Sequence, residues 1–301
     1  MSEAAPRRCG YVALVGAPNA GKSTLLNQLV GAKLSIVSPK VQTTRSRVLG
    51  IVVADAAQLI FVDTPGIFAP KRRLERAMVA AAWAGAEDAD LVVMLVDAAR
   101  GVDADAERIM AGLKSAGRRA QLVLNKVDLV EPPRLLPLAD RLRKEALFDA
   151  VFMVSALSGD GVADLRRYLA AALPEGPWLY PEDQLTDLPM RLLAAEATRE
   201  QVFLQLQQEL PYATLVETET WEERTDGSVK IGQAIHVQRA SQKAIMLGKG
   251  GSRIKEIGAR ARAELERILG RRVHLFLFVR VTEDWTEDRE RYRAMGLEFE
   301  S

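Results

Sequence analysis

The regular alternation of apolar segments with helical patterns is the feature that most constrains the fold. It runs from Gly10 to about Leu173, and several apolar segments are continuously hydrophobic, as in strands covered on both faces. The predicted strands are 11–15, 47–53, 58–63, 91–97, 121–126 and 150–156, and the predicted helices lie near 22–31, 73–86, 104–117, 133–146 and 161–172. This order predicts a doubly wound α/β sheet. Only four residues separate 47–53 from 58–63, too few for a crossover helix, so this pair should be antiparallel.

The second part of the chain has a different order of elements. A length of 301 residues suggests about two domains, and residues 174–190 hold four of the thirteen prolines without sustained periodicity. The order α-β-β-α-α-β is then expected from a helix over 189–209, strands 212–223 and 228–239 around Asp226-Gly227, helices 242–247 and 252–269, and a strand 273–281. We therefore expect an N-terminal tail (1–9), an α/β domain (10–175), a linker (176–190), a smaller α+β domain (191–285) and a C-terminal tail (286–301).

Charge is distributed unevenly along the chain. The net charge is +1, but residues 239–280 carry eleven Lys/Arg against three Glu, a local +8, so the other residues carry −7. This asymmetry predicts a basic surface for a polyanion, although a solvated helix face would have the same composition. The single cysteine, Cys9, cannot form an internal disulfide, and no Cys/His cluster has zinc-ligand spacing. Without a signal-peptide pattern or a bilayer-length apolar run, we expect a cytoplasmic protein.

A glycine-rich motif lies between the first predicted strand and the first predicted helix. It fits G-x-x-x-x-G-K-[ST] in the structural context that this phosphate-binding loop requires. Its backbone N–H groups should surround phosphates, Lys22 should reach the β/γ-phosphates, and Ser23 should bind Mg²⁺. The predicted nucleotide-binding residues here are Gly16, Ala17, Pro18, Asn19, Ala20, Gly21, Lys22, Ser23 and Thr24.

Two further strand ends predict guanine as the base. Asn125, Lys126 and Asp128 follow one strand, and a carboxylate there can accept hydrogen bonds from N1–H and N2–H₂ of guanine, which adenine lacks. Asn125 would support the loop, and Lys126 would lie along the base. Ser155, Ala156 and Leu157 end the next strand, where a backbone N–H would reach guanine O6. The expected ligands are therefore GTP and GDP.

Two segments should respond to the γ-phosphate. Asp63, Thr64, Pro65 and Gly66 end a strand; Asp63 would hold Mg²⁺ through water, and the Gly66 N–H would contact the γ-phosphate. In the 33–47 loop, Thr44 is favoured over Thr43 as the switch threonine that binds Mg²⁺, with an ordinary polar loop as the alternative. The predicted metal site is thus Ser23, Thr44 and Asp63.

The residue after Gly66 predicts slow intrinsic hydrolysis. Ras-like enzymes keep a glutamine there to orient water, but this chain has Ile67, which cannot do so. No general base is assigned. Asn19 could instead hold a K⁺ ion that bridges the phosphates and takes the electrostatic role of an arginine finger; the alternative is a plain turn residue.

A second glycine-rich turn lies in the basic region. Gly248, Lys249, Gly250 and Gly251 stand between two predicted helices and match the GXXG loop of KH domains, which clamps the backbone of about four nucleotides. Arg253 and Lys255 follow at the start of the next helix. Together with the local charge, this predicts that the second domain binds RNA.

The combined motifs resemble the Era family of bacterial GTPases over nearly the whole chain. The resemblance is carried by the five GTPase elements, by the stretches Lys33–Arg45 and Asp63–Lys71, and by the GKGG loop. It implies a P-loop GTPase domain of Ras-like fold followed by a type II KH domain, binding to the 3′ end of small-subunit (16S) ribosomal RNA, and a role in 30S subunit maturation. It also implies peripheral association with the cytoplasmic face of the cell membrane, and we expect a monomer. Phe68 departs from the family, in which many members have histidine.

Two other interpretations compete. An RNA-modification GTPase of the same superfamily would need an additional catalytic domain or a reactive C-terminal cysteine, and Cys9 does not fit. A pure RNA-binding module with a structural α/β domain would not need Lys22, Ser23, Asp63 and Asp128, so their presence argues against it.

Overall fold

The computed structural model describes residues 6–38, 40, 43–207 and 209–299. It divides into two compact units. Unit 1 comprises Met1–Ser35, Thr44–Asp187 and Tyr292–Ser301, and unit 2 comprises Ile36–Thr43 and Leu188–Arg291. Part of the predicted 33–47 loop therefore groups with the second unit.

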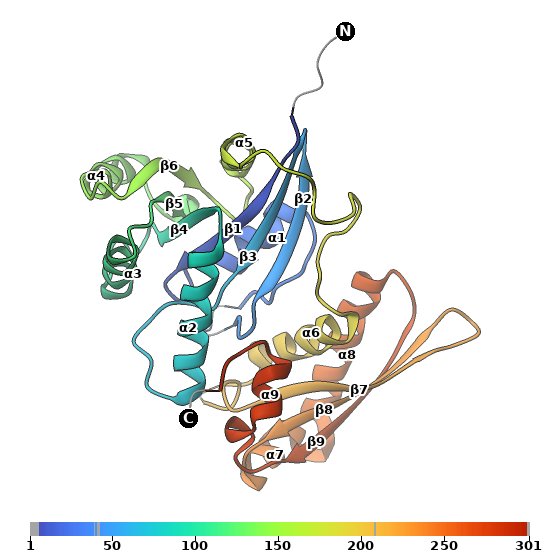
Figure 1. Ribbon diagram of the computed structural model, residues 1–301. Helices are drawn as coiled ribbons and strands as arrows, with labels where there is room; N and C mark the ends of the chain where they lie inside the picture. Colours follow the sequence, from blue (N-terminus) through green and yellow to red (C-terminus); the bar gives the residue numbers. More distant parts are fainter. Residues whose placement is uncertain (1–5, 39, 41–42, 208, 300–301) are drawn as a thin grey trace. The chain divides into compact units, whose positions relative to one another are not determined.

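Among the described residues, unit 1 is built on one six-stranded sheet (Figure 1). Its order is β2-β3-β1-β4-β5-β6, with only β2 and β3 antiparallel, as the short connection predicted. The strands are β1 (Arg8–Gly16), β2 (Val48–Ala54), β3 (Ala57–Asp63), β4 (Leu91–Asp97), β5 (Ala120–Asn125) and β6 (Phe148–Val154). The doubly wound sheet is confirmed, although β1 begins two residues inside the segment expected to be an N-terminal tail, whose residues 1–5 lie outside the described part of the chain.

Helices cover both faces of this sheet because the strands are apolar on both sides. One core contains buried residues of α2, α3 and α4, and the other contains those of α1 and α5. The helices are α1 (Lys22–Val30), α2 (Arg73–Asp88), α3 (Ala104–Ser115), α4 (Pro132–Arg143) and α5 (Val162–Ala172), with a 3-10 turn η1 (Val127–Leu129). The carboxyl ends of β1, β3, β5 and β6 thus carry the four predicted nucleotide-binding segments at one edge of the sheet, where α/β proteins bind ligands.

Two segments expected to be a linker and a tail pack against unit 1. Gln58 of β3 accepts the backbone N–H groups of Leu179 and Tyr180 and donates to the Tyr180 carbonyl, at 2.8–3.1 Å. At the other end of the chain, Tyr292 and Leu297 are buried with residues of α2. Neither the Gln58 hydrogen bonds nor the burial of Tyr292 and Leu297 gave a recognisable signal in the sequence, because both depend on residues far apart in the chain.

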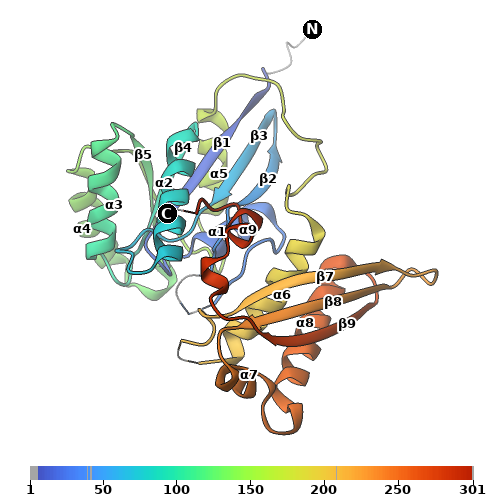
Figure 2. The same ribbon diagram turned by 60° about the horizontal axis from the view of Figure 1, so that its bottom comes forward.

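Unit 2 has a three-stranded sheet in the described part of the chain, covered on one face by helices (Figure 2). Its order is β7-β8-β9, with β7 antiparallel and β9 parallel to β8. The elements are α6 (Met190–Gln205), β7 (Leu215–Glu223), β8 (Val229–Val237), α7 (Ala240–Leu247), η2 (Lys249–Gly251), α8 (Ser252–Leu269), β9 (Val273–Val281) and η3 (Trp285–Glu287). The last helix, α9 (Arg289–Ala294), begins in unit 2 and ends in unit 1. The order α-β-β-α-α-β is as predicted.

The first helix of unit 2 is shorter than the sequence pattern indicated. A helix to residue 209 was expected, but α6 ends at Gln205 because Leu206 is extended, with φ −104° and ψ 156°. This change of direction lets Leu206 and Leu210 both enter the core of unit 2. Burial of two leucines contributes more than another helical turn would.

Candidate nucleotide and RNA sites

The glycine-rich loop after β1 is held together by hydrogen bonds from the Lys22 side chain to the loop's own backbone. Asn19 and Gly21 have positive φ values of 64° and 97°, and the Lys22 ammonium donates to the Gly16 and Ala17 carbonyls at 3.0 and 3.1 Å. Lys22 is only 6% exposed, and burial lowers its pKa to about 8, an effect that Asp63 partly opposes. The ammonium is thus held over the loop, where a phosphate would replace the carbonyls as its partner.

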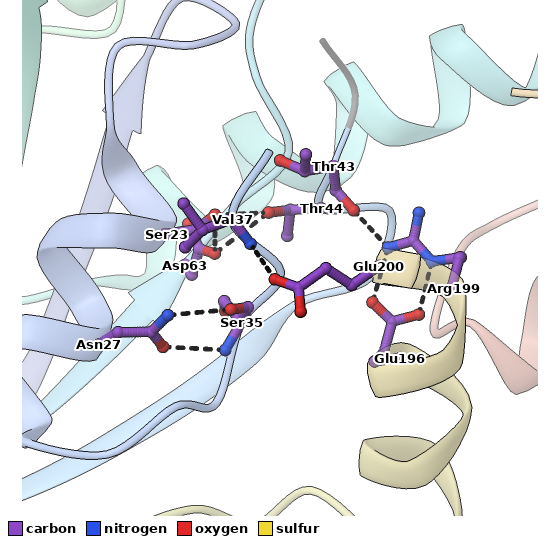
Figure 3. Close-up of polar contacts among 10 residues, drawn as sticks. All are labelled: Ser23, Asn27, Ser35, Val37, Thr43, Thr44, Asp63, Glu196, Arg199 and Glu200. Carbon is purple, nitrogen blue, oxygen red and sulfur yellow. Dashed lines mark hydrogen bonds and ion pairs between the residues drawn. The ribbon is translucent and has the colours of Figure 1, made fainter. Parts of the chain in front are cut away.

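Ser23, Thr44 and Asp63 converge at the start of α1 (Figure 3). The Asp63 Oδ2 accepts from the Ser23 hydroxyl at 2.8 Å and from the Thr44 hydroxyl at 3.1 Å, and the two hydroxyls lie 2.9 Å apart. Burial raises the pKa of Asp63, while Lys22 and the nearby hydroxyls of Ser23, Ser35 and Thr44 oppose this. Within the described residues, the buried Oδ1 of Asp63 has no hydrogen-bond partner.

These three oxygen donors fit Mg²⁺, which prefers hydroxyl, carboxylate, phosphate and water oxygens. The unpartnered Asp63 Oδ1 would gain a partner in a metal-bound water. Thr44, favoured from the sequence, lies in this cluster, whereas the Thr43 carbonyl accepts from Arg199 of α6.

Asn125 links three of the predicted segments. Its Nδ2 donates to the Ala20 carbonyl at 2.8 Å, and its Oδ1 accepts the Ala156 N–H at 3.0 Å. A Cβ on Gly21 would lie 2.1 Å from Asn125 Nδ2, so glycine is required for this approach. The supporting role predicted for Asn125 therefore has a geometric basis. The Ala156 N–H makes this link and the Ser155 N–H donates to the Asp160 carbonyl at 3.0 Å, which leaves the predicted contact to guanine O6 to the Leu157 N–H.

The expected guanine-facing residues lie beside this link. Asp128 is exposed on η1, and Leu157 is 80% exposed, so both can meet a base. Lys126 has a positive φ of 64° and pairs with Asp97 at 2.7 Å. Sequence reasoning missed Asp97; its position at the end of β4, next to β5, was the available signal.

The segment after β3 is fixed by packing and backbone contacts. Thr64 donates to the Leu14 carbonyl at 2.8 Å, so its side chain supports the sheet instead of reaching outward. Ile67 is fully buried in the α2–α4 core, and its N–H donates to the Gly16 carbonyl at 3.1 Å. Its side chain cannot orient a water, which agrees with the expectation from the sequence. A Cβ on Gly66 would come within 3.0 Å of Pro18, so the Gly66 backbone lies directly against the phosphate-binding loop.

The GKGG turn of unit 2 is open to solvent. Gly248, Gly250 and Gly251 have positive φ values of 70°, 60° and 75°, and no heavy atom lies within 4 Å of a Cβ built on Gly250 or Gly251. Lys249 and Lys255 are exposed, while Arg253 donates to the Ile245 carbonyl at 2.8 Å and so braces the turn. The backbone can therefore be approached closely from outside.

Part of the basic region is neutralised by carboxylates. Arg260, Arg267, Arg271 and Arg280 form ion pairs with Glu256, Glu264, Glu223 and Glu219. Within the described residues, Lys249 and Lys255 have no such partner. Part of the charge that has no ion pair thus lies at the GKGG turn and the first turn of α8, where a polyanion could approach it.

Together these features define a class: a P-loop GTPase domain joined to a KH domain. Family models bear this out, because the model described as a 50S ribosome-binding GTPase matches residues 11–126 and the KH domain model matches residues 209–286.

The chain belongs to the Era family of GTPases and is a GTPase. It is 60% identical over 297 residues to GTPase Era of Afipia carboxidovorans, covering 99% of this chain and 96% of that protein. It is also 60% identical over 296 residues to GTPase Era of Sinorhizobium medicae, with 98% and 96% covered. The resemblance to the Era family that the motifs indicated is confirmed. The chain is therefore assigned to this family and not to the RNA-modification GTPases.

Two solved structures share the whole architecture. A single-residue variant of Aquifex aeolicus Era bound to GDP·AlF₄⁻ superposes with a TM-score of 0.91 at 42% identity, covering 96% of this chain and 99% of that one. Era in complex with MgGDPNP and nucleotides 1506–1542 of 16S ribosomal RNA has the same score, identity and coverage. In the described part of the chain, no helix combines the length and apolarity needed to cross a membrane.

Proposed function

We propose that this GTPase acts as a switch that binds the 3′ end of 16S ribosomal RNA through its KH domain and assists maturation of the 30S subunit. The observation that carries the proposal is that one chain contains two suitable sites. The first is the phosphate-binding loop with the Ser23–Thr44–Asp63 cluster of oxygen atoms. The second is the solvent-exposed GKGG turn, where Lys249 and Lys255 have no ion pair within the described residues. The Era structure with MgGDPNP and 16S nucleotides supports the same pairing of ligands.

In the nucleotide site, the phosphates would occupy the loop from Gly16 to Thr24, with Lys22 turned from the backbone carbonyls to the β/γ-phosphates. Ser23, Thr44 and Asp63 would hold Mg²⁺, which would supply positive charge to offset the negative charge of the phosphates. The Gly66 N–H would contact the γ-phosphate. Asp128 would accept from guanine N1–H and N2–H₂, with Lys126 along the base and Ser155–Leu157 at O6.

In the RNA site, the backbone of about four nucleotides would lie on Gly248–Gly251, where the glycines allow close approach. Lys249, Lys255 and Arg253 would contact phosphates. The test is binding of this protein, loaded with a non-hydrolysable GTP analogue, to an RNA of the last ~40 nucleotides of 16S RNA and to a scrambled RNA of equal length. Equal affinity for the two RNAs would contradict the proposal.

For hydrolysis, a K⁺ ion held by Asn19, the phosphates and the backbone of the 33–47 loop would stabilise the transition state. The support is the buried Ile67, which leaves no water-orienting glutamine, and the position of Asn19 within the phosphate-binding loop, with a positive φ of 64°. Hydrolysis should be faster in KCl than in NaCl at equal ionic strength, and Asn19→Ala should remove the difference while GTP affinity changes little. Equal rates in both salts, with stimulation only by RNA, would favour activation by RNA instead.

For its place in the cell, we propose a cytoplasmic monomer that associates peripherally with the cytoplasmic face of the membrane. The support is the family resemblance alone. Sedimentation of the purified protein tests the monomer, and co-sedimentation with vesicles of anionic and neutral lipid tests the membrane association.

A further inference from the structure

In the sequence, the segment 36–43 lies between two points of unit 1 that are fixed by hydrogen bonds. At its start, Asn27 of α1 accepts the Leu34 and Ser35 N–H groups at 2.8 and 3.0 Å and donates to the Ser35 carbonyl at 2.9 Å. At its end, the Thr44 hydroxyl lies against Ser23 and Asp63. Both anchors belong to the nucleotide-binding unit, but the residues between them group with unit 2.

Three contacts join this segment to α6. The Val37 N–H donates to Glu200 Oε1 at 3.0 Å, and the Thr43 carbonyl accepts from the Arg199 guanidinium. Between them, the Lys40 ammonium donates to the Phe203 and Leu206 carbonyls, at the C-terminal end of α6, where the helix dipole favours a cation. Figure 3 shows the contacts of Val37 and Thr43 with α6, and Lys40 contacts the same helix, so that every third residue from 37 to 43 is joined to it.

Arg199 and Glu200 are buried charges, each 2% exposed. Arg199 donates to both oxygens of Glu196 at 2.8 and 2.6 Å and lies over the Phe203 ring at 5.1 Å. Buried charges are costly unless their hydrogen bonds are satisfied. Arg199 is fixed by Glu196 and Phe203, so it offers the Thr43 carbonyl a donor at a set position.

Thr43 and Thr44 are adjacent in the chain. The contact of Thr43 with Arg199 is therefore linked to the contacts of Thr44 with Ser23 and Asp63. A peptide unit is rigid, so fixing the Thr43 carbonyl restricts where the Thr44 hydroxyl can lie. We propose that Arg199 is a positioning residue for GTP hydrolysis: through Thr43 it holds Thr44 at the Mg²⁺ site, and Lys40 and Glu200 support it. The inference rests on the proposed role of Thr44 as a Mg²⁺ ligand. It makes the first helix of the RNA-binding domain part of the switch.

The test begins in metal-free, nucleotide-free protein. Amide hydrogen exchange of peptides covering 36–44 should be about 10-fold faster in Arg199→Ala than in the parent, and intermediate in Arg199→Lys, which keeps a donor. Arg191→Ala is the matched control, because Arg191 is an exposed arginine of the same helix. Exchange unchanged in Arg199→Ala would overturn the proposal. If that variant does not fold, Lys40→Met, which removes the charge from within the segment, is measured instead, with the same two outcomes.

Hydrolysis supplies the second readout. Arg199→Ala should lower kcat roughly 10-fold and raise the Mg²⁺ concentration for half-maximal rate, while GTP affinity in EDTA stays at the parent value. In a Thr44→Ala background, Arg199→Ala should have no further effect, because it acts through Thr44. If the two substitutions lower kcat by independent factors that multiply in the double variant, the positioning role of Arg199 is overturned. If Thr44→Ala alone leaves the Mg²⁺ dependence unchanged, the proposed metal site fails, while the exchange measurement still reports whether α6 holds the segment.

Discussion

The two turns that we propose bind nucleotide and RNA are both glycine-rich and precede a helix, yet they differ in how closely other residues pack against them. At the nucleotide loop, Lys22 is 6% exposed and Gly21 has Asn125 directly against it. At the GKGG turn, Lys249 is exposed and the space beside Gly251 is open. A small, highly charged ligand needs fixed donors on several sides, whereas a polymer must enter and leave along its length. Glycine-rich turns thus suit both kinds of recognition.

The largest expected effect is at the open turn. Replacing Lys249 and Gly250 with two Asp places negative charge where phosphates must approach, and like-charge juxtaposition costs several kcal/mol, on the order of a 1000-fold loss of RNA affinity. Asp tolerates the positive φ of Gly250 comparatively well, so the fold should persist.

Filter binding of the 16S 3′-end RNA at two salt concentrations measures this loss, and the salt dependence should flatten. GTP affinity of the same variant is the internal control. Undiminished RNA binding by the folded variant would place the RNA surface elsewhere.

At the nucleotide site, Asp128→Asn removes the acceptor expected to pair with guanine. Discrimination for guanine should fall by roughly 2–4 kcal/mol, the scale of a lost charge-assisted bidentate contact, and xanthine nucleotides should gain. Competition titrations with GTP and XTP measure it. A GTP affinity equal to that of the parent would remove the guanine assignment.

A matched pair of alanine substitutions, at Gly21 and Gly251, tests the difference in packing around the two turns. Gly21 and Gly251 have φ values of 97° and 75°, so both substitutions strain the backbone by roughly 1 kcal/mol. Only Gly21→Ala also forces Asn125 from its two hydrogen bonds, which should bring its total cost to about 3 kcal/mol.

Urea unfolding curves of the two variants give the comparison. Equal losses of the free energy of unfolding would mean that the link through Asn125 contributes nothing. A larger loss of the free energy of unfolding for Gly251→Ala than for Gly21→Ala would mean that the GKGG turn, and not the phosphate-binding loop, is the more tightly packed of the two.

The smallest expected effect concerns pH. Burial lowers the pKa of Lys22 to about 8 in the free protein, and bound phosphates should raise it again. Above pH 8, Lys22 is mostly neutral in the free protein, so GTP binding must be accompanied by protonation of Lys22. GTP affinity should therefore fall about 10-fold between pH 7 and 9, and Lys22 should cause no change below that range. Calorimetry in buffers of different ionisation enthalpy measures the proton uptake. Lys22→Gln should bind weakly without this pH dependence; the same dependence in that variant would assign it to another group.

The sequence by itself determined the order of strands and helices and the loops that carry chemistry. Continuous apolar strands, the spacing from Gly16 to Ser23, and Asn125 to Asp128 at a strand end are local patterns, readable because side-chain periodicity and turn chemistry depend on near neighbours. The same holds for the GKGG turn between two helices.

The tertiary structure alone decided how distant residues complete these sites. Asn125 meets Ala20 across 105 residues, and Arg199 meets Thr43 across 156. The burial of Tyr292 on α2 and the ion pair of Lys126 with Asp97 are likewise unmarked in the sequence. A hydrogen bond depends on distances of about 3 Å, which packing of whole elements fixes and which no local pattern records. The motifs could therefore be predicted from the sequence, whereas the contacts of α6 with Val37, Lys40 and Thr43 could not.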